Sequence, residues 1–346
     1  MEELQIALIT VCRNRLHHLQ QTLPQNIRDN ASCPGVYFLV LDYNSSDGLT
    51  DWITAEMQPH LQSGLLRFYR TNEPECYHHA HSRNMAFLLA DADLLCNLDA
   101  DNYTGKDFAL YLRKRFMENR KRILITFGGQ QKKASSDTYG RVCVTRNDFL
   151  SVNGYDENIE LYGGVDIDLA HRVAILGREK LVMEEESFLH CIKHPDTERF
   201  IEMRIYRDLY ACYVAITEGQ LYYLLLLFKN QSFELAMINK ERSAARPEDN
   251  TLDEGSYLWD EDGLHLKFLH GYTWNLQGNS AGQPLKSAVP DITWFRVQSK
   301  EGLATWAVQY MYVKTRSLMK SGKTVNEQGF GQGHAYQLPD TTTHRP

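Results

Sequence analysis

The chain has 346 residues, enough for one large domain or two modest ones. A hydrophobic fraction of 43% suffices for a packed core, while a net charge of −7 and a pI near 6.0 argue against general nucleic-acid binding. The N-terminus lacks a basic region, so we expect no signal peptide, and the apolar run 221–228 is too short to span a bilayer. The seven cysteines include no Cys-x-x-Cys pair, which indicates reduced thiols.

Strand-like and helix-like runs alternate over the first third of the chain. Apolar, β-branched runs predict strands at 6–11, 36–41, 65–69, 94–98 and 122–127. The intervening and following runs predict helices at 16–23, 50–61, 80–90 and 108–120. This alternation indicates a mostly parallel sheet with helices on both faces.

The middle of the chain is expected to complete this sheet. The predicted elements are an edge strand at 139–145, helices at 148–154 and 169–176, and a strand at 187–192. Apolar residues recur every three or four positions over 197–217, which predicts one amphipathic helix.

The C-terminal part has a different character, which divides the chain into 1–219 and 220–346. For the run 222–228 we favour core packing over a membrane-surface or partner contact. A polar linker is expected within 230–255, short strands or hairpins within 256–298, and a helix at 305–319. From about 322 the chain has little to bury, which predicts a mobile tail.

One Asp-x-Asp triplet stands out by its context. Four triplets occur, at 91–93, 99–101, 166–168 and 260–262, but only Asp99-Ala-Asp101 directly follows a strand-like run. Open α/β sheets bind ligands at the carboxyl ends of their strands. Two carboxylates there can hold a divalent cation that neutralises a diphosphate.

Four motifs follow one another in a family-like order between residues 4 and 195. They are Thr10-Val-Cys-Arg-Asn-Arg15, Asp42 with an Asn-Ser-Ser-Asp tail, Asp99-Ala-Asp101, and Leu161-Tyr-Gly-Gly-Val-Asp-Ile-Asp168. With them the chain resembles inverting glycosyltransferases of the GT-A fold, of the family 2, β-1,4-galactosyltransferase and chondroitin-polymerase types. The resemblance implies an α/β, Rossmann-like GT-A catalytic domain at 1–219. Residues 220–346 would then form an accessory region for acceptor or partner contacts.

The resemblance also implies a metal ion and a UDP-sugar. Manganese or magnesium would be held by Asp101 and Asp99 with one histidine, for which His190 is preferred and His194 stays open. Asp42 would accept a hydrogen bond from uracil. The implied nucleotide contacts are Thr10, Cys12, Arg13, Arg15, Asp42, Arg83, Asp99 and Ala100. The histidines of 77–81 are expected to line the nucleotide loop or face solvent rather than to bind zinc.

An inverting transfer needs one base to take the proton of the acceptor hydroxyl. The resemblance implies that this base is Asp166, although Val165 stands where the family often has Glu. Gly163 and Gly164 allow close backbone approach to a ligand, and with Asp168 they are expected to bind the acceptor. Both carboxylates would also suit the start of a helix.

The predicted function is a metal-dependent, inverting transfer of a hexosyl or N-acetylhexosaminyl group from a UDP-sugar to a glycan or glycoconjugate hydroxyl. Bacterial polysaccharide synthesis is the expected setting, in the cytoplasm, with a peripheral contact at the inner face of the membrane left open. One alternative is a sugar-nucleotide nucleotidyltransferase, which the glycine-free loop 10–15 disfavours. The other is a non-catalytic nucleotide- or glycan-binding module, which Val165 keeps open.

Overall fold

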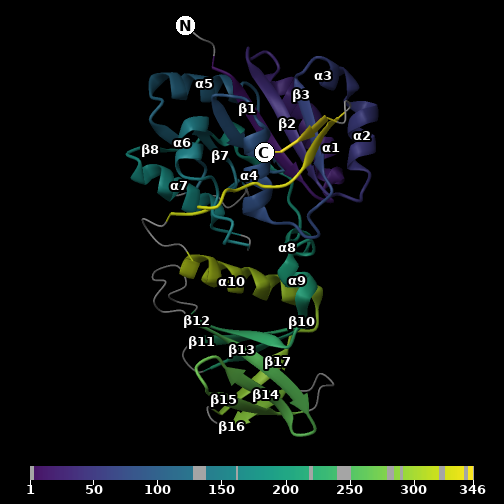
Figure 1. Cartoon of the computed structure of the whole chain (residues 1–346), viewed down its shortest axis with the longest axis vertical. Coiled ribbons are helices and arrows are strands. Elements are labelled where there is room, and N and C mark those ends of the chain that lie inside the picture. Colours follow the sequence, from purple (N-terminus) through teal and green to yellow (C-terminus); the bar gives the residue numbers. More distant parts are fainter. Residues whose placement is uncertain are drawn as a thin grey trace. The chain divides into compact units, whose positions relative to one another are not determined.

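The computed structural model describes residues 4–127, 138–160, 163–217, 221–239, 251–278, 284–288, 291–318, 324–338 and 342–345. The chain forms two compact units, drawn in Figure 1. The first comprises 1–160, 165–194 and 320–346, and the second comprises 161–164 and 195–319.

A nine-stranded sheet organises the first unit, in the order β19-β18-β3-β2-β1-β4-β7-β6-β8. Its strands are β1 (Ile6–Cys12), β2 (Val36–Tyr43), β3 (Leu66–Thr71), β4 (Leu94–Asn97), β6 (Arg122–Ile125), β7 (Val142–Thr145), β8 (Glu179–Val182), β18 (Ala335–Leu338) and β19 (Thr342–His344). The pairs β2–β3, β1–β2, β1–β4 and β6–β8 are parallel, whereas β7 is antiparallel to both of its neighbours. The predicted α/β class with a mostly parallel sheet is confirmed.

Helices cover the sheet because its central strands are apolar on both faces: every residue of β1 and β2 is buried. The helices are α1 (Leu16–Asn30), α2 (Leu49–Glu56), α3 (Gln58–Gln62), α4 (His79–Leu89), α5 (Phe108–Glu118), α6 (Arg146–Ser151) and α7 (Val165–Ile175). One core cluster joins alternate strand residues with side chains of α1, α2 and α5, and α4 packs against β1 and β2. Helix α1 runs through Pro24 to Asn30, past its predicted end, because Asn26 and Ile27 extend its buried face.

Two predicted strands of this unit differ in place or extent. The strand expected at an edge is β7, which lies inside the sheet between β4 and β6. The strand expected at 187–192 is reduced to β9 (His190–Cys191), which pairs with β5 (Asn102–Tyr103) and follows the 3₁₀ turn η1 (Glu186–Phe188). Both differences depend on pairing partners that lie far away in the sequence.

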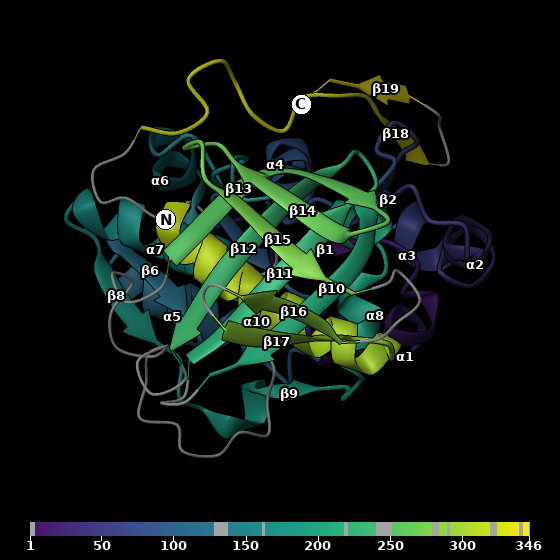
Figure 2. The same ribbon diagram turned by 90° about the horizontal axis from the view of Figure 1, so that it is seen from below.

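A closed eight-stranded barrel forms the second unit, and Figure 2 shows its strands. They are β10 (Leu209–Ile216), β11 (Leu221–Phe228), β12 (Ser232–Asn239), β13 (Thr251–Asp260), β14 (Gly263–Phe268), β15 (Thr273–Gln277), β16 (Leu285–Ala288) and β17 (Asp291–Arg296). The unit also contains α8 (Asp196–Phe200), α9 (Arg204–Asp208) and α10 (Lys300–Leu318). Trp294 is fully buried inside the barrel, and a second core cluster lies between β10–β12 and helices α8 and α10.

The prediction of one long helix over 197–217 is wrong. The segment forms α8, α9 and then β10, which pairs with β11 and β17 and closes the barrel. Ala211, Tyr213 and Ala215 alternate into the barrel core, so strand pairing overrides the helical spacing. Core packing of 222–228 is confirmed, because Leu225 and Leu227 enter the barrel core while Leu224 and Leu226 enter the cluster beside α10.

The predicted division at 219/220 also differs from the structure. Residues 195–217 belong with the barrel, and 320–346 return to the first unit. The tail expected to be mobile contains 324–338, whose strand β18 pairs antiparallel with β3. Hydrogen bonds, rather than an apolar face, hold much of this segment, so its composition did not reveal it. Across the described helices, none combines the length and apolar character needed to cross a membrane.

Candidate functional site

A buried arginine links two of the predicted site carboxylates. Arg83 of α4 is 2% exposed, and its Nη1 donates to both oxygens of Asp166, at 2.7 and 2.8 Å. Its Nη2 donates to Oδ1 of Asp99 at 2.8 Å. The candidate base and the first carboxylate of the Asp-x-Asp motif therefore share one cation.

The pKa values of the two carboxyl groups in this cluster, Asp166 and Asp99, are shifted in opposite directions. Burial raises the pKa of Asp166 to about 6, against the lowering influence of Arg83. At Asp99 the effect of burial is outweighed by the positive charge of Arg83, so the pKa of this carboxyl is lowered. Asp166 therefore gains basicity near neutral pH, while Asp99 stays ionised.

The surroundings of the cluster leave Asp99 little freedom. Asn97 of β4 donates to Asp99 Oδ1 at 3.0 Å and to the Gly140 carbonyl at 2.8 Å. A Cβ at Gly140 would overlap Asp99 Oδ2 and lie 2.7 Å from Arg83 Nη2. The backbone of the turn before β7 therefore lies directly against the Asp99 carboxylate. Only glycine can occupy position 140 without displacing that carboxylate.

Asp101 meets His194, not the preferred His190. Nε2 of His194 lies 3.0 Å from Oδ2 of Asp101, and Asn102 Nδ2 donates to the other oxygen at 2.9 Å. Strand β5 pairs with β9, and just beyond this pair the N–H of Ile192 donates to the carbonyl of Asp101 at 2.8 Å. These contacts bring the segment that contains His194 next to the Asp101 carboxylate. His190 is exposed on β9, so the geometry favours His194, the alternative left open, over the preferred His190.

The two side chains could both reach a divalent ion. Their atoms lie at hydrogen-bond distance, 3.0 Å, which is also about the separation of neighbouring ligands about 2.1 Å from an octahedral ion. A carboxylate with an imidazole suits manganese, and the remaining positions suit diphosphate and water oxygens.

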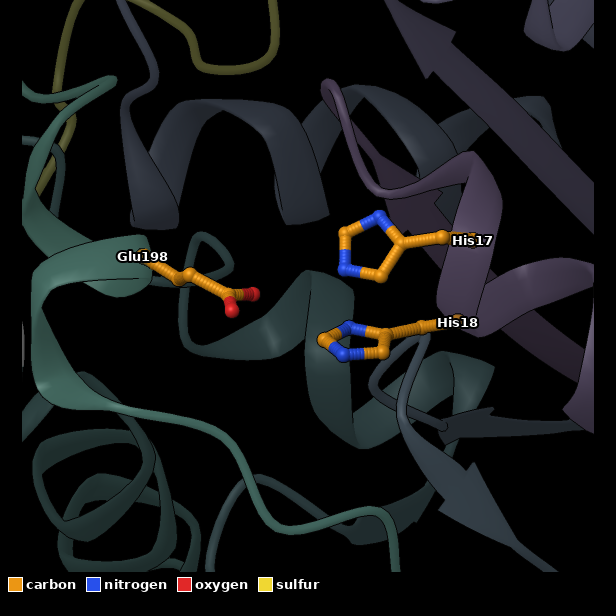
Figure 3. Close-up of side chains that lie close together, drawn as sticks. All are labelled: His17, His18 and Glu198. Carbon is orange, nitrogen blue, oxygen red and sulfur yellow. The ribbon is translucent and has the colours of Figure 1, made fainter.

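Two histidines at the start of α1 lie near this pair. The rings of His17 and His18 have centroids 4.0 Å apart, and His18 lies 4.8 Å from the His194 ring. Burial, followed by the charges of His17 and His194, lowers the pKa of His18 to about 4. Figure 3 shows the two neighbouring imidazoles of His17 and His18.

Sequence reasoning missed Arg141, a fully buried cation behind the metal candidates. Its guanidinium donates to the carbonyls of Phe188 and Tyr103, the latter at 2.9 Å, and to Asn102 Oδ1 at 3.3 Å. Burial lowers the pKa of Arg141 to about 10. Its position directly after Gly140 carried no recognisable signal, because all of its partners come from other elements.

Several predicted nucleotide contacts serve the fold in this structure. Asp42 is fully buried and accepts from Ser45 N–H at 2.7 Å and Thr50 Oγ1 at 3.0 Å, with Arg70 3.2 Å away. Burial raises the pKa of Asp42, opposed by these partners. Both of its oxygens are thus engaged by residues of the fold, and the uracil contact stays a prediction.

The remaining nucleotide candidates surround the end of β1. Arg13 donates to the carbonyls of Tyr43, Pro74 and Glu75, at 3.2, 2.9 and 2.7 Å, and so fixes the loop after β3. Arg15 directly precedes α1. The buried residues of the group are Thr10, Cys12 and Ala100.

The acceptor candidates divide into a paired carboxylate and two glycines. Asp168 is 5% exposed and bound to Arg172, one turn along α7, with Nε 2.8 Å from its Oδ2. This ion pair holds Asp168 against its own helix, and its expected acceptor contact stays a prediction. Gly163 and Gly164 have φ values of +84° and +100°, and a Cβ at Gly163 would meet nothing within 4 Å. Asp166 then falls in the first turn of α7, where the helix dipole favours a carboxylate.

The histidines of the loop before α4 join separate segments. Nδ1 of His81 lies 2.7 Å from the hydroxyl of Tyr43, and its Nε2 lies 2.8 Å from the Gln332 carbonyl. Nε2 of His78 lies 3.1 Å from the carbonyl of Glu157. These contacts connect β2, the loop before α7 and the C-terminal segment around α4.

Residues 123–203 match a family model described as the N-terminal domain of galactosyltransferase. The matched segment begins in β6 and contains Gly163, Gly164, Asp166, Asp168 and His194. The resemblance to galactosyltransferases is thereby confirmed for this part of the chain. Among curated proteins, none matches the sequence significantly.

Solved glycosyltransferase structures are similar to part of the chain. A mannosyltransferase from Pyrobaculum calidifontis, in complex with GDP-Man and Mn²⁺, has a TM-score of 0.46 and 15% identity, covering 56% of this chain and 57% of its own. TarS of S. aureus with UDP-GlcNAc has a TM-score of 0.42 and 12% identity, covering 56% and 63%. The catalytic domain of Drosophila β1,4-galactosyltransferase 7 with xylobiose has a TM-score of 0.40 and 15% identity, covering 58% and 74%. The chain thus spans less than two thirds of the mannosyltransferase and TarS structures.

Proposed function

We propose that the protein is a metal-dependent, inverting glycosyltransferase that transfers a hexosyl or N-acetylhexosaminyl group from a UDP-sugar to a glycan hydroxyl. The observation that carries the proposal is the Arg83 cluster, which joins Asp99 of the Asp-x-Asp motif to Asp166 in a galactosyltransferase-like segment. The acceptor class, a bacterial polysaccharide or glycoconjugate, follows from the family resemblance alone.

Asp101 and His194 are the residues that would hold manganese or magnesium. When bound, such an ion offsets the negative charge that develops on a departing diphosphate. Asn102 supports the site by holding the second oxygen of Asp101, which fixes the orientation of the carboxylate.

Asp166 acts as the base. Its carboxylate accepts two bonds from Arg83, yet two carboxylate oxygens offer about four lone-pair sites, so each oxygen can still accept an acceptor hydroxyl. As the hydroxyl oxygen forms its bond to the anomeric carbon, its proton passes to Asp166. The bond between that carbon and the diphosphate oxygen breaks on the opposite side, and its electron pair leaves with UDP. UDP needs no proton on departure, so a single base suffices.

Replacement of the base tests this assignment. Asp166→Asn should lower kcat by about a thousandfold, within the range that general base catalysis contributes, while UDP affinity measured by calorimetry persists. Asp262→Asn, in a different Asp-x-Asp triplet at an exposed barrel turn, is the matched control and should behave as wild type. Full activity of Asp166→Asn would refute Asp166 as the base.

A further inference from the structure

The C-terminal segment 324–338, here called the strap, packs within the first unit although its composition predicted a mobile tail. In Figure 1 it is the yellow segment that passes α4 before reaching β18. Its first half, through Gly331, is hydrogen-bonded to the loop 153–157, which leads from α6 toward the motif that contains Asp166, and its second half pairs with β3.

Asn326 clamps this loop through three hydrogen bonds. Its Nδ2 donates to the carbonyls of Asn153 and Tyr155, at 2.7 and 2.6 Å. Its Oδ1 accepts the N–H of Glu157 at 3.1 Å. One amide side chain thus satisfies three backbone groups of a five-residue loop, with both of its donor hydrogens in use.

A second part of the strap ties the same loop to α4. The N–H of Gly331 donates to Glu157 Oε1 at 2.7 Å, and Asn84 of α4 donates to the same oxygen at 2.8 Å. A Cβ at Gly331 would lie 2.8 Å from the nitrogen of Met85, so glycine is needed for this close approach. Phe330 packs edge-on against Phe149 of α6, with ring centroids 5.8 Å apart.

The clamped loop in turn supports the proposed catalytic cluster. Asn84 accepts the N–H of Tyr155 at 2.7 Å and donates to its carbonyl at 2.9 Å. The fully buried ring of Tyr155 lies 5.6 Å from the guanidinium carbon of Arg83, the residue next to Asn84. Arg83 is the cation that holds both Asp99 and Asp166.

We propose that Asn326 is a positioning residue for sugar transfer: it fixes the loop 153–157, which fixes Tyr155 beneath Arg83 and thereby the direction of Asp166. This inference rests on the proposed function. It makes the strap part of the catalytic unit rather than a tail of the barrel.

Two variants of the full chain isolate the amide of Asn326. Asn326 has a φ of +51°, a left-handed conformation that glycine and aspartate also adopt, so Asn326→Gly and Asn326→Asp remove the clamp without backbone strain. Asn326→Asp turns a donor into an acceptor that faces two carbonyl oxygens, and should therefore be the more harmful change. Glu327→Ala is the matched control, because Glu327 is exposed and makes no hydrogen bond with the residues that the structure describes.

Steady-state kinetics and amide exchange then decide the proposal. Asn326→Gly should lower kcat about tenfold, as expected for a loss of one to two net hydrogen bonds, with the KM for the UDP-sugar changed less than about twofold. Amide exchange at Tyr155 and Glu157 should accelerate by about the same factor. Glu327→Ala should change neither quantity.

Unchanged kcat, or an equal effect of Glu327→Ala, would overturn the positioning role. Unchanged exchange at 153–157 would overturn the clamp itself, whether or not the protein transfers sugar. If the wild-type protein transfers no sugar at all, the proposed function and the catalytic role of Asn326 fail together, and exchange still shows whether Asn326 holds the loop.

Discussion

The buried carboxyl of Asp166 makes the pH dependence of transfer predictable. Burial raises its pKa to about 6, against the charge of Arg83. A base works only when deprotonated, so kcat should be full above this pKa and fall as the pH drops through about 6. Arg83→Gln removes a charge that lowers the pKa, so in a pH–rate profile its acid limb should move to higher pH. An acid limb that moves downward, or does not move, would contradict the assignment.

The two histidines of the β9 region should differ in their effect on metal binding. His194→Ala should weaken manganese binding, measured by calorimetry in the presence of UDP, at least about tenfold, because tenfold is already the lower end for residues that only orient a metal ligand. His190→Ala, four residues away and exposed, should leave the affinity unchanged. A loss in His190→Ala with normal binding in His194→Ala would reverse the ligand assignment.

Local patterns indicated candidate site residues but could not decide between neighbouring ones. Asp99 and Asp101 were predictable because a strand-like run precedes them. The choice of His194 over His190 depends on the pairing of β5 with β9, whose strands are about ninety residues apart in the chain. The bonds of Asp42 to Ser45, Thr50 and Arg70 were likewise not predictable, because these partners come from other elements, and its uracil contact stays a prediction.

At the scale of elements, the turn before β7 limits the space around Asp99. Gly140→Ala should lower kcat at least about tenfold, because the added Cβ would overlap Asp99 Oδ2 and displace a charged group of the site. Thermal unfolding is the control: because the added Cβ also strains the buried Asp99–Arg83 pair, the melting temperature should fall somewhat, and kcat is measured at a temperature at which the variant is still folded. Normal activity would show that Asp99 can move without consequence.

Elements were predictable where the evidence for them is local. The runs that form β1, β2 and β4 are continuous and apolar because parallel strands are buried on both faces. Predictions failed where the local pattern misleads. β10 was taken for a helix because its apolar residues recur at helical spacing, although its partner β11 follows directly in the chain. β7 was taken for an edge strand because its neighbours β4 and β6 are not evident from its own sequence. The strap has too few apolar residues for its packing to be predicted from composition. It is held by hydrogen bonds to α4 and to the loop 153–157.

On the scale of the whole molecule, each unit has a core of its own. Trp294→Ala in the barrel core should cost about 3–5 kcal/mol of unfolding free energy, the range for a large buried aromatic side chain. UDP affinity, which we assign to the first unit, should be unchanged below the denaturation midpoint. Chemical unfolding and calorimetry on the same preparation test this, and a parallel loss of UDP binding would contradict a donor site built by the first unit alone.

The division into units could not be predicted from contiguous sequence. The chain leaves the first unit near residue 195, forms the barrel, and returns near residue 320. A composition change near 220 suggested one boundary, yet β10 precedes that change and β18 follows the barrel. β10 belongs to the barrel, and β18 belongs to the nine-stranded sheet of the first unit. Neither therefore follows the boundary that composition suggested.

The most direct test of the account is UDP release from a panel of UDP-sugars, each assayed with manganese, magnesium or EDTA. We predict slow release of UDP from one UDP-sugar, supported by manganese or magnesium, abolished by EDTA and absent in Asp101→Asn. Equal release in EDTA would contradict the metal dependence. Neither release nor metal-dependent UDP binding with any donor would contradict the assignment as a UDP-sugar transferase.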